Sequence, residues 1–474
     1  MISSLAFGYL LQTAPTPTFN EVTIYNQGFG LVKETRILDL KAGRQSIAIH
    51  DVAEQIEPSS VGIKSLTNPG GFNILEQNYQ YDLINTQAIL NKSVGQKIRF
   101  IRHFGDKTEV LEGTLISAPF AVVSSQDSGS YQTYNGMVIK TDDGRIVLNP
   151  SGEIEVSMVP AGMISVPTLV WDLESDKAGP QKVELSYLTK GLNWNADYVL
   201  TLGDKLSADL MGWVTINNQS GASFTDAKLK LLAGDVRRVY PQYQQEAYGR
   251  AGGGVAMKSA DQFQQQNLFE YHLYTLQRPA TVRNREIKQI SLLQGTGIKY
   301  EKKLILDSLR DMGMYYPSEG EVGTGDLKPE VRVEFVNSKQ NGLGMPLPKG
   351  NIKVYLRDAS GSMQMLGEDA IDHTPKDEKI SLAIGRSFDI VATRRRTNYT
   401  RTGPQSFSES FDIEVRNRKD ETDTVHVYER HYGDWRVTQK NMDFQKLDAS
   451  TMDFVVTMKP GETKHVIYTV NTRW

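Results

Sequence analysis

Short runs in which apolar and polar residues alternate cover most of the chain. In the first part, Val22 and Ile24 open such a run, and similar runs follow between turns that contain glycine. Alternation with period two is the pattern of a β-strand with one buried face. Residues 18–80 therefore predict a small antiparallel β unit.

Residues 81–160 combine one helical signal with several short strands. Asn85 can cap a short helix, five short strands follow, and Gly113 lies where a strand must bend sharply. A helix followed by five strands resembles the SH3-like or Sm-like small barrel. Sm-like barrels often bind RNA, but this segment lacks an aromatic and basic platform for stacking bases, so no nucleic-acid partner is expected.

The rest of the chain, residues 161–474, predicts an Ig-like β-sandwich region. Val183 and Tyr187 belong to one of its alternating runs. Two segments near 240–267 and 313–328 break the pattern and are rich in Gly, and the first is also rich in Gln, so we expect mobile insertions there. The sequence thus predicts a mainly β, multi-domain protein with an embedded small barrel and few short helices.

Composition narrows the possible functions. The 474 residues are 39% hydrophobic and 23% charged, with a net charge of −3 and no cysteine. These values are typical of a folded globular protein. The small net charge provides no basic field for nucleic acid. The absence of cysteine excludes disulfides, thiolate metal sites and cysteine nucleophiles, and it is compatible with an oxidising compartment.

The N-terminal segment, residues 1–17, has features of a secretory leader. Its apolar centre runs from Leu5 to Leu11, and Ala14 is a small residue suited to cleavage. No Lys or Arg precedes the apolar centre, so a simple tail is the alternative. We expect a periplasmic or secreted protein. Elsewhere no window holds the ~18 apolar residues of a membrane helix, so no transmembrane segment is predicted.

Five blocks of sequence carry a resemblance to a known family. The blocks are residues 186–202, 212–236, 269–282, 367–390 and 468–474. In these blocks the chain is similar to the bacterial domain-of-unknown-function 4139 family, which shares its domain with mucoidy-inhibitor-type proteins. The resemblance implies a β-rich fold and export, but no activity and no site residues. The long helical insertion of the mucoidy-inhibitor type is missing, which weakens any analogy to a polysaccharide-related role.

Asp358, Ser360 and Ser362 have the Asp-x-Ser-x-Ser spacing of a metal-dependent adhesion site. Such a site needs a helix after the loop, whereas here alternating runs flank the motif on both sides. Gly361 can supply a positive φ at the tip of a β-hairpin. We therefore expect a hairpin whose serine and aspartate side chains bond to the turn itself.

The most polar block contains Asp372, His373 and Glu378. Paired carboxylates can act as acid and base when burial separates their pKa values, but a solvated loop is the simpler interpretation. The cluster Arg394 to Arg396 is expected to pair with acids such as Asp389 or Asp412. No histidine pair has zinc spacing on a helix, so no metal, cofactor or catalytic residue is assigned.

Two hypotheses for function follow. The first is a non-enzymatic, exported binding or scaffold protein of the bacterial cell envelope, whose partner is an unidentified protein or an envelope polysaccharide. The second is a hydrolase or carbohydrate-active enzyme that uses Asp372, His373 and Glu378. An enzyme would place these side chains in one pocket with a buried carboxylate, whereas a scaffold would leave them on a surface loop.

Overall fold

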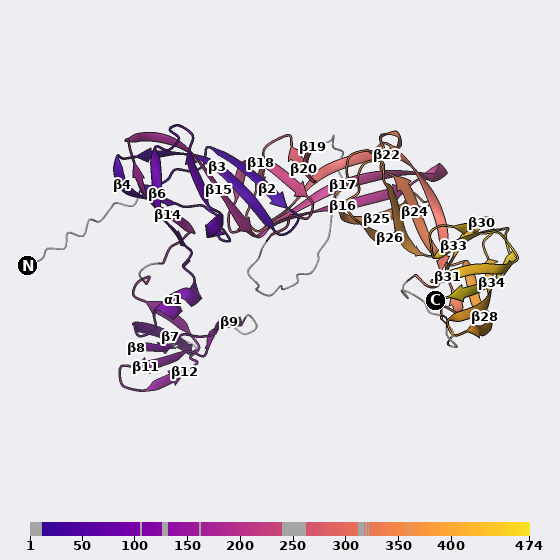
Figure 1. The fold of residues 1–474 in the computed structure, drawn as a ribbon. Coiled ribbons are helices and arrows are strands. Elements are labelled where there is room, and N and C mark those ends of the chain that lie inside the picture. Colours follow the sequence, from indigo (N-terminus) through magenta and orange to yellow (C-terminus); the bar gives the residue numbers. More distant parts are fainter. Residues whose placement is uncertain are drawn as a thin grey trace, which may run out of the picture.

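The computed structural model describes residues 12–104, 107–125, 131–160, 163–238, 262–310, 317, 320, 322–358 and 360–474. Strands account for 64% of the chain and helical residues for 4%, which confirms the prediction of a mainly β protein with several sheets. The sheets follow one another along an elongated molecule, with the N-terminal and C-terminal strands at opposite ends (Figure 1). The helical elements of the described residues are α1 (Thr86–Lys92), η1 (Pro58–Ser60), η2 (Asp204–Leu206) and η3 (Lys339–Asn341).

Two sheets share an apolar core at the N-terminal end. Leu38 and Leu185 from one sheet and Ile47 and Trp171 from the other are buried in the same cluster. Their strands alternate because every second residue must reach this core. The first sheet runs β1 (Gln12–Thr13), β4 (Gly43–Ile49), β14 (Thr168–Ser175), β6 (Phe72–Gln80). The second runs β19 (Phe263–Leu268), β20 (Tyr271–Leu276), β18 (Phe224–Ala233), β2 (Phe19–Tyr25), β3 (Phe29–Leu40), β15 (Gly179–Lys190), β5 (Gly62–Ser65), with β21 (Ala280–Val282) beside β18.

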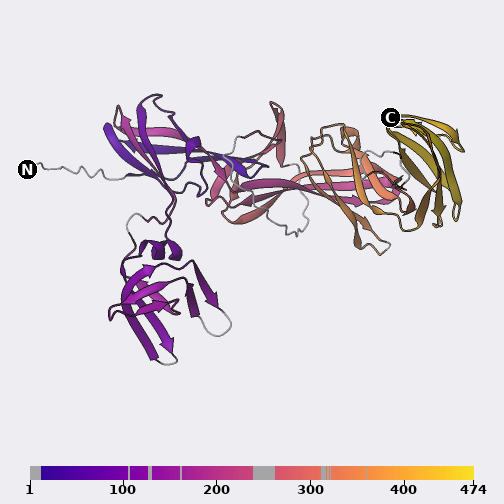
Figure 2. The same cartoon turned by 60° about the horizontal axis from the view of Figure 1, so that its bottom comes forward.

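A separate unit is inserted between β6 and β14, which are neighbours in the first sheet. The chain leaves and returns side by side, because the N–H of Ile84 donates to the carbonyl of Ile164 at 2.9 Å. The unit has its own core around Leu90, Phe100 and Leu115, and it projects from the side of the molecule (Figure 2). Its strands are β7 (Lys97–Phe104), β8 (Lys107–Ser117), β9 (Ala121–Ser125), β10 (Tyr131–Asn135), β11 (Val138–Thr141), β12 (Ile146–Leu148) and β13 (Glu153–Val156).

Local signals explain how this insert unit starts and bends. The side chain of Asn85 accepts a hydrogen bond from the N–H of Ala88 at 2.9 Å and caps α1. A Cβ at Gly113 would lie 2.5 Å from the carbonyl oxygen of Lys140, so only glycine allows β8 and β11 to approach this closely. The five main strands are ordered β12-β11-β8-β7-β13, and among the described residues no pairing joins β12 to β13. The sheet is therefore open rather than a closed barrel.

One long strand connects the middle of the molecule to its C-terminal end. β22 (Glu286–Asp307) pairs first with β17 (Ser207–Asn218), and its last residues pair with β24 (Glu330–Val336) and with β30 (Asp423–Arg430). Hydrogen bonding thus continues from one sheet into the next without a linker. The other strands of this region are β16 (Leu192–Leu202), β25 (Gly350–Arg357), β26 (Met363–Ile371) and β27 (Lys379–Arg386).

The C-terminal region is a sandwich with a separate core. Phe411 and Val466 from one sheet pack with Val427 and Phe454 from the other. One sheet continues from β22 through β30 to β33 (Thr451–Met458) and β32 (Gln445–Lys446). The other runs β23 (Gly325–Leu327), β28 (Ile390–Gly403), β29 (Ser406–Asn417), β34 (Thr463–Arg473), β31 (Asp434–Lys440).

Two strands, β17 and β29, end in the same kind of corner, which is built on a buried asparagine. Asn218 ends β17 and Asn417 ends β29, both side chains are fully buried, and each amide donates to three backbone carbonyls. In both corners a glutamate, Glu286 or Glu462, accepts a hydrogen bond from the backbone of the adjoining turn. The two regions therefore share one way of turning a strand. The carbonyls belong to Ala222, Val282 and Arg283 for Asn218, and to Glu421, Met458 and Lys459 for Asn417.

Three predicted segments fall partly outside the described residues. In the predicted insertion 240–267, residues 240–261 lie outside the described residues. Phe263, however, is buried in the core and begins β19, so the predicted end of the insertion at residue 267 is wrong. Of 313–328, the last residues form β23 beside β28. Of the leader 1–17, positions 12 and 13 form β1, which pairs with β4. No helix of the described residues has the length and apolar character to cross a membrane.

Candidate functional site

The polar block singled out in the sequence lies in the connection between β26 and β27. Asp372 and Glu378 are exposed, whereas His373 is partly buried. Its Nδ1 accepts a hydrogen bond from the backbone N–H of Lys349 at 3.2 Å, and its Nε2 lies 3.4 Å from the amide nitrogen of Asn26. Burial lowers the pKa of His373, so the ring is neutral at pH 7. Neither carboxylate is buried beside it.

The Asp358 motif forms the tip of the β25–β26 hairpin, as predicted, with the two strands paired antiparallel. One carboxylate oxygen accepts hydrogen bonds from the N–H groups of Ser360 and Ser362, and the other accepts one from Gln364. Bonds from Ser360 and then Gln364 lower the pKa of Asp358 to about 2. Gly361 has φ +85°. The turn itself therefore uses the carboxylate that a metal would need.

The structure brings no set of potential metal ligands together in the part of the chain that it describes. Within the ranges that the structure describes, no group of three or more His, Asp and Glu side chains is placed to hold a metal ion. His426 and His431, which are close in sequence, have different partners: the first pairs with Asp453 and the second with Tyr468. The two histidines therefore do not form a common site.

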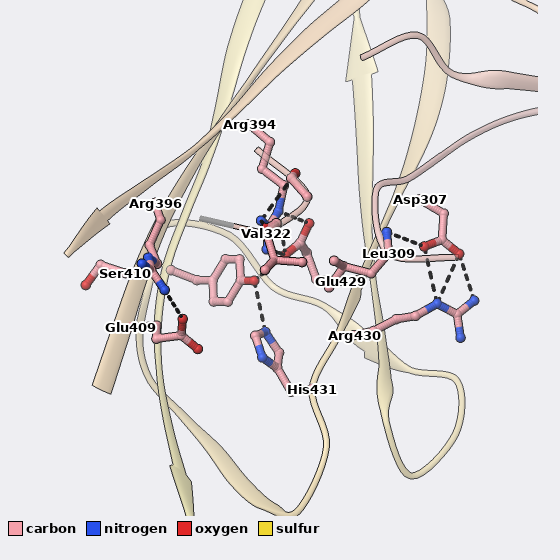
Figure 3. A network of polar contacts seen from close by, with 12 residues as sticks. Asp307, Leu309, Val322, Arg394, Arg396, Glu409, Ser410, Glu429, Arg430 and His431 are labelled. Carbon is pink, nitrogen blue, oxygen red and sulfur yellow. Dashed lines mark hydrogen bonds and ion pairs between the residues drawn. The ribbon is translucent and has the colours of Figure 1, made fainter. Parts of the chain in front are cut away.

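A network of polar side chains is buried inside the C-terminal sandwich (Figure 3). Arg394 on β28 donates to Glu429 on β30, with Nε–Oε1 and Nη2–Oε2 distances of 2.9 and 2.7 Å. The hydroxyl of Tyr468 also donates to Glu429, and its oxygen lies 2.9 Å from Nε2 of His431. All four side chains are 1% exposed. Such burial of charge is tolerated only when the charges are paired and hydrogen bonded.

The electrostatics of this network follow from burial and from Arg394. Burial acts to raise the pKa of Glu429, but the charge and hydrogen bonds of Arg394 outweigh it and lower the pKa. Burial raises the pKa of Tyr468 well above its usual value and lowers the pKa of His431 to about 4. At neutral pH the network is an ion pair of Arg394 and Glu429 flanked by two neutral rings.

The network also fixes the chain segment that precedes β23. Nη1 of Arg394 donates to the carbonyl of Val322 at 3.1 Å, and the guanidinium stacks 4.1 Å from the ring centre of Phe411. Arg396 pairs with Glu409 at 3.0 Å. The sequence-based expectation that Asp389 or Asp412 would pair with the arginine cluster is wrong for Arg394 and Arg396. Arg394 pairs with an acid of the facing sheet, and Arg396 pairs with Glu409 on the neighbouring strand β29.

Next to this network lies a cavity of about 560 Å³. Its volume is in the range of small-molecule sites, roughly 300–1,000 Å³. It lies where β22 ends and β23 begins, and one of its lining residues, Asp307, pairs with Arg430 (Figure 3). The lining combines apolar and charged side chains: Ile305, Leu306, Asp307, Arg310, Asp326, Leu327, Lys328, Glu330, Arg386, Val391 and Arg416.

Sequence reasoning missed the buried network, although a signal was present. Arg394 lies on the same face of its strand as Ile390 and Ala392, which are fully buried, and Glu429 shares a face with Val427. Period-two alternation thus places both charges in the core. The cavity had no such signal, because its lining comes from six separate stretches of chain.

Comparisons with known proteins add no family: no family model and no curated protein matches the chain.

Proposed function

We propose that the protein is a non-enzymatic binding or scaffold protein that is exported to the bacterial cell envelope. The observation that carries the proposal is the continuous strand β22, whose 22 residues belong to two successive regions of the molecule. At about 3.3 Å per residue such a strand spans roughly 70 Å. Shared strands keep binding surfaces at a fixed separation, as a scaffold requires.

The inserted unit supports the same function. It is attached through two adjacent chain segments, has its own core and projects from the long axis of the molecule (Figure 2). We propose that it is related to the SH3-like and Sm-like small barrels, because a helix precedes five strands, and that it presents a surface to a partner. The repeated asparagine corner supports an Ig-like relationship for the two sandwich regions that contain it.

The hydrolase alternative receives less support. Asp372 and Glu378 are exposed, whereas an acid and base pair needs burial or a charged neighbour to separate the pKa values of its members. His373 is held by the backbone of Lys349, which accounts for its position without a substrate. A surface loop with these contacts favours the binding or scaffold function.

Export is part of the proposal, and it requires that the fold keep contacts to the N-terminal segment after a leader is removed. The N–H of Ala14 donates to the carbonyl of Ala48 at 2.8 Å, and Arg36 donates to the carbonyl of Pro15 at 2.9 Å. Cleavage after Ala14 would remove β1 but would keep the bond to Pro15. The mature chain would then begin at Pro15, and Arg36 would still hold that residue in place.

Fractionation of the native organism followed by affinity capture tests this function. We expect the protein in an exported fraction, in a complex that survives washing. The combined substitutions Asp372→Asn, His373→Gln and Glu378→Gln should leave that complex unchanged. Recovery of a partner-free protein from the cytoplasm, or a hydrolytic turnover that these substitutions abolish, would contradict the proposal.

A further inference from the structure

The cavity beside the buried network differs from the rest of the surface in the balance of its charges. Counting its lining residues and their direct ion-pair partners gives six cations and four carboxylates, a net charge of about +2, although the whole chain carries −3. A local excess of positive charge in a concave site favours anions. The cations are Arg310, Lys328, Arg332, Arg386, Arg416 and Arg430, and the carboxylates are Asp307, Asp326, Glu330 and Glu414.

The carboxylates that line the cavity already have partners within the protein. Burial acts to raise the pKa of Glu330, but hydrogen bonds from Arg332 and Arg310 outweigh it and lower the pKa. Two cations thus share one carboxylate. Asp307 is likewise paired, with Arg430 at 2.7 Å, whereas Asp326 accepts a hydrogen bond at 2.7 Å from the neutral hydroxyl of Thr393.

Two of the cations lack such partners. Among the described residues, Arg386 has no ion pair, and Lys328 contacts only the ring of Phe388, with its ammonium 5.1 Å from the ring centre. Arg416 is paired with Glu414 at 2.9 Å and also donates to Thr393. The cavity therefore offers a guanidinium and an ammonium group that form no direct ion pair with the described residues.

The part of the wall formed by β23, which Lys328 directly follows, is held in place by the buried network. β23 pairs with β28 from Arg394 to Ala392, and Arg394 also holds the carbonyl of Val322 just before β23. Apolar side chains, Leu327 and Val391 among them, exclude water from part of the lining. A site that is fixed before binding loses little entropy when a ligand enters.

We propose that this cavity binds a small carboxylate-bearing ligand, through Arg386 and Lys328. Guanidinium groups suit this chemistry because their planar N–H groups match the two oxygens of a carboxylate. The carboxylate could belong to a uronic acid or to an acidic peptide, and both carry the same recognised group. The inference rests on the proposed binding function and names the ligand class.

Titration calorimetry on the full chain at constant ionic strength tests the site. The probes are galacturonate and acetyl-Asp-Glu, with galactose and inorganic phosphate as controls for the sugar ring and for unspecific anion binding. We expect at least one of the two carboxylates to bind at a single site and to show which source is preferred. We expect galactose to show no binding and phosphate to bind more weakly.

Variants then assign the binding to the cavity. Arg386→Gln and Lys328→Gln should each weaken it roughly tenfold, the effect of losing one charged hydrogen bond. Arg357→Gln, at the exposed end of β25 outside the cavity, is the matched control and should change nothing. Thermal melts should be the same for all three, since all three side chains are exposed.

Absence of binding for both carboxylates, equal binding of phosphate, or an equal loss in Arg357→Gln would overturn the inference. These outcomes are separable from the proposed scaffold function. An envelope complex that persists in a chain without carboxylate binding leaves the scaffold function in place and removes only the cavity as its site.

Discussion

The N-terminal and C-terminal regions both bury an arginine, a glutamate and a tyrosine, but with opposite electrostatic results. At the N-terminal end Arg36 donates to one oxygen of Glu34 and also to Asp51, which is 47% exposed. Tyr187 lies 3.3 Å from the other oxygen of Glu34. Burial raises the pKa of Glu34, and Arg36 offsets this only in part because its charge is divided between two acids.

At the C-terminal end Arg394 has a single carboxylate partner. Both oxygens of Glu429 accept hydrogen bonds from it, and the pKa of Glu429 is lowered despite complete burial. The same three residue types therefore surround a glutamate whose pKa is lowered in one region and raised in the other. The number of acids that share the arginine differs between the two regions, and so does the direction in which the pKa of the glutamate shifts.

The largest expected effect comes from removing the two buried glutamate charges in turn. Glu429→Gln should destabilise the protein by about 3–5 kcal/mol, because Arg394 is left as an uncompensated buried charge. Glu34→Gln should cost less than about 1 kcal/mol, because Arg36 keeps Asp51 as a partner and an amide retains hydrogen bonds. Urea unfolding at pH 7 gives both values, and equal losses would contradict the comparison.

A second effect is acid sensitivity that belongs to the C-terminal region. The pKa of His431 falls from 6.5 to about 4 on folding, so the unfolded chain binds more protons between these values and stability falls as pH decreases through this window. The loss should reach on the order of 3 kcal/mol by pH 4. His431→Phe should flatten the slope of unfolding free energy between pH 6.5 and 4. An unchanged slope would show that carboxylates cause the whole acid dependence.

The two asparagine corners should contribute equally to stability, whereas the two buried glutamates should not. Asn218→Ala and Asn417→Ala each leave buried carbonyls without a donor and should each cost about 2 kcal/mol. Thermal and urea unfolding of the two variants measure this. Costs that differ severalfold would mean that the matching hydrogen bonds conceal different packing around the two corners.

The smallest effect concerns an acid that is fully hydrogen bonded but exposed. The pKa of Asp358 is about 2, so its stabilising contribution is present above the unfolded value near 3.8 and is lost as pH falls toward 2. Asp358→Ala should lower the melting temperature only slightly. Calcium, magnesium or a chelator should leave the melt of the unaltered protein unchanged, and a metal-dependent shift that Asp358→Ala removes would contradict the hairpin interpretation.

Local features were predictable from the sequence because their causes lie within a few residues. Asn85 caps its helix through Ala88, and the Asp358 hairpin satisfies its own turn. The strand periodicity likewise predicted a mainly β fold. Each of these features depends on contacts at short sequence separation.

Features that join distant segments were not predictable in this way. Trp171 bonds to Gln77 across the inserted unit, a separation of 94 residues, and alternation alone does not choose such partners. The cavity depends on the meeting of β22, β23, β24, β27, β28 and β29, so its charges are scattered in the sequence. Arg394 was recognisable as inward-facing, but its partner Glu429 was not, because strand pairing rather than spacing brings them together.

The central difference between the two regions is the direction in which the pKa of the buried glutamate is shifted. Carbon-13 observation of the glutamate carboxyl groups during a pH titration, with Glu34→Gln and Glu429→Gln used to assign the two signals, measures it most directly. The structure predicts a pKa above 4.5 for Glu34 and below 4.5 for Glu429. Equal values, or the reverse order, would contradict the role assigned to Arg36 and Arg394.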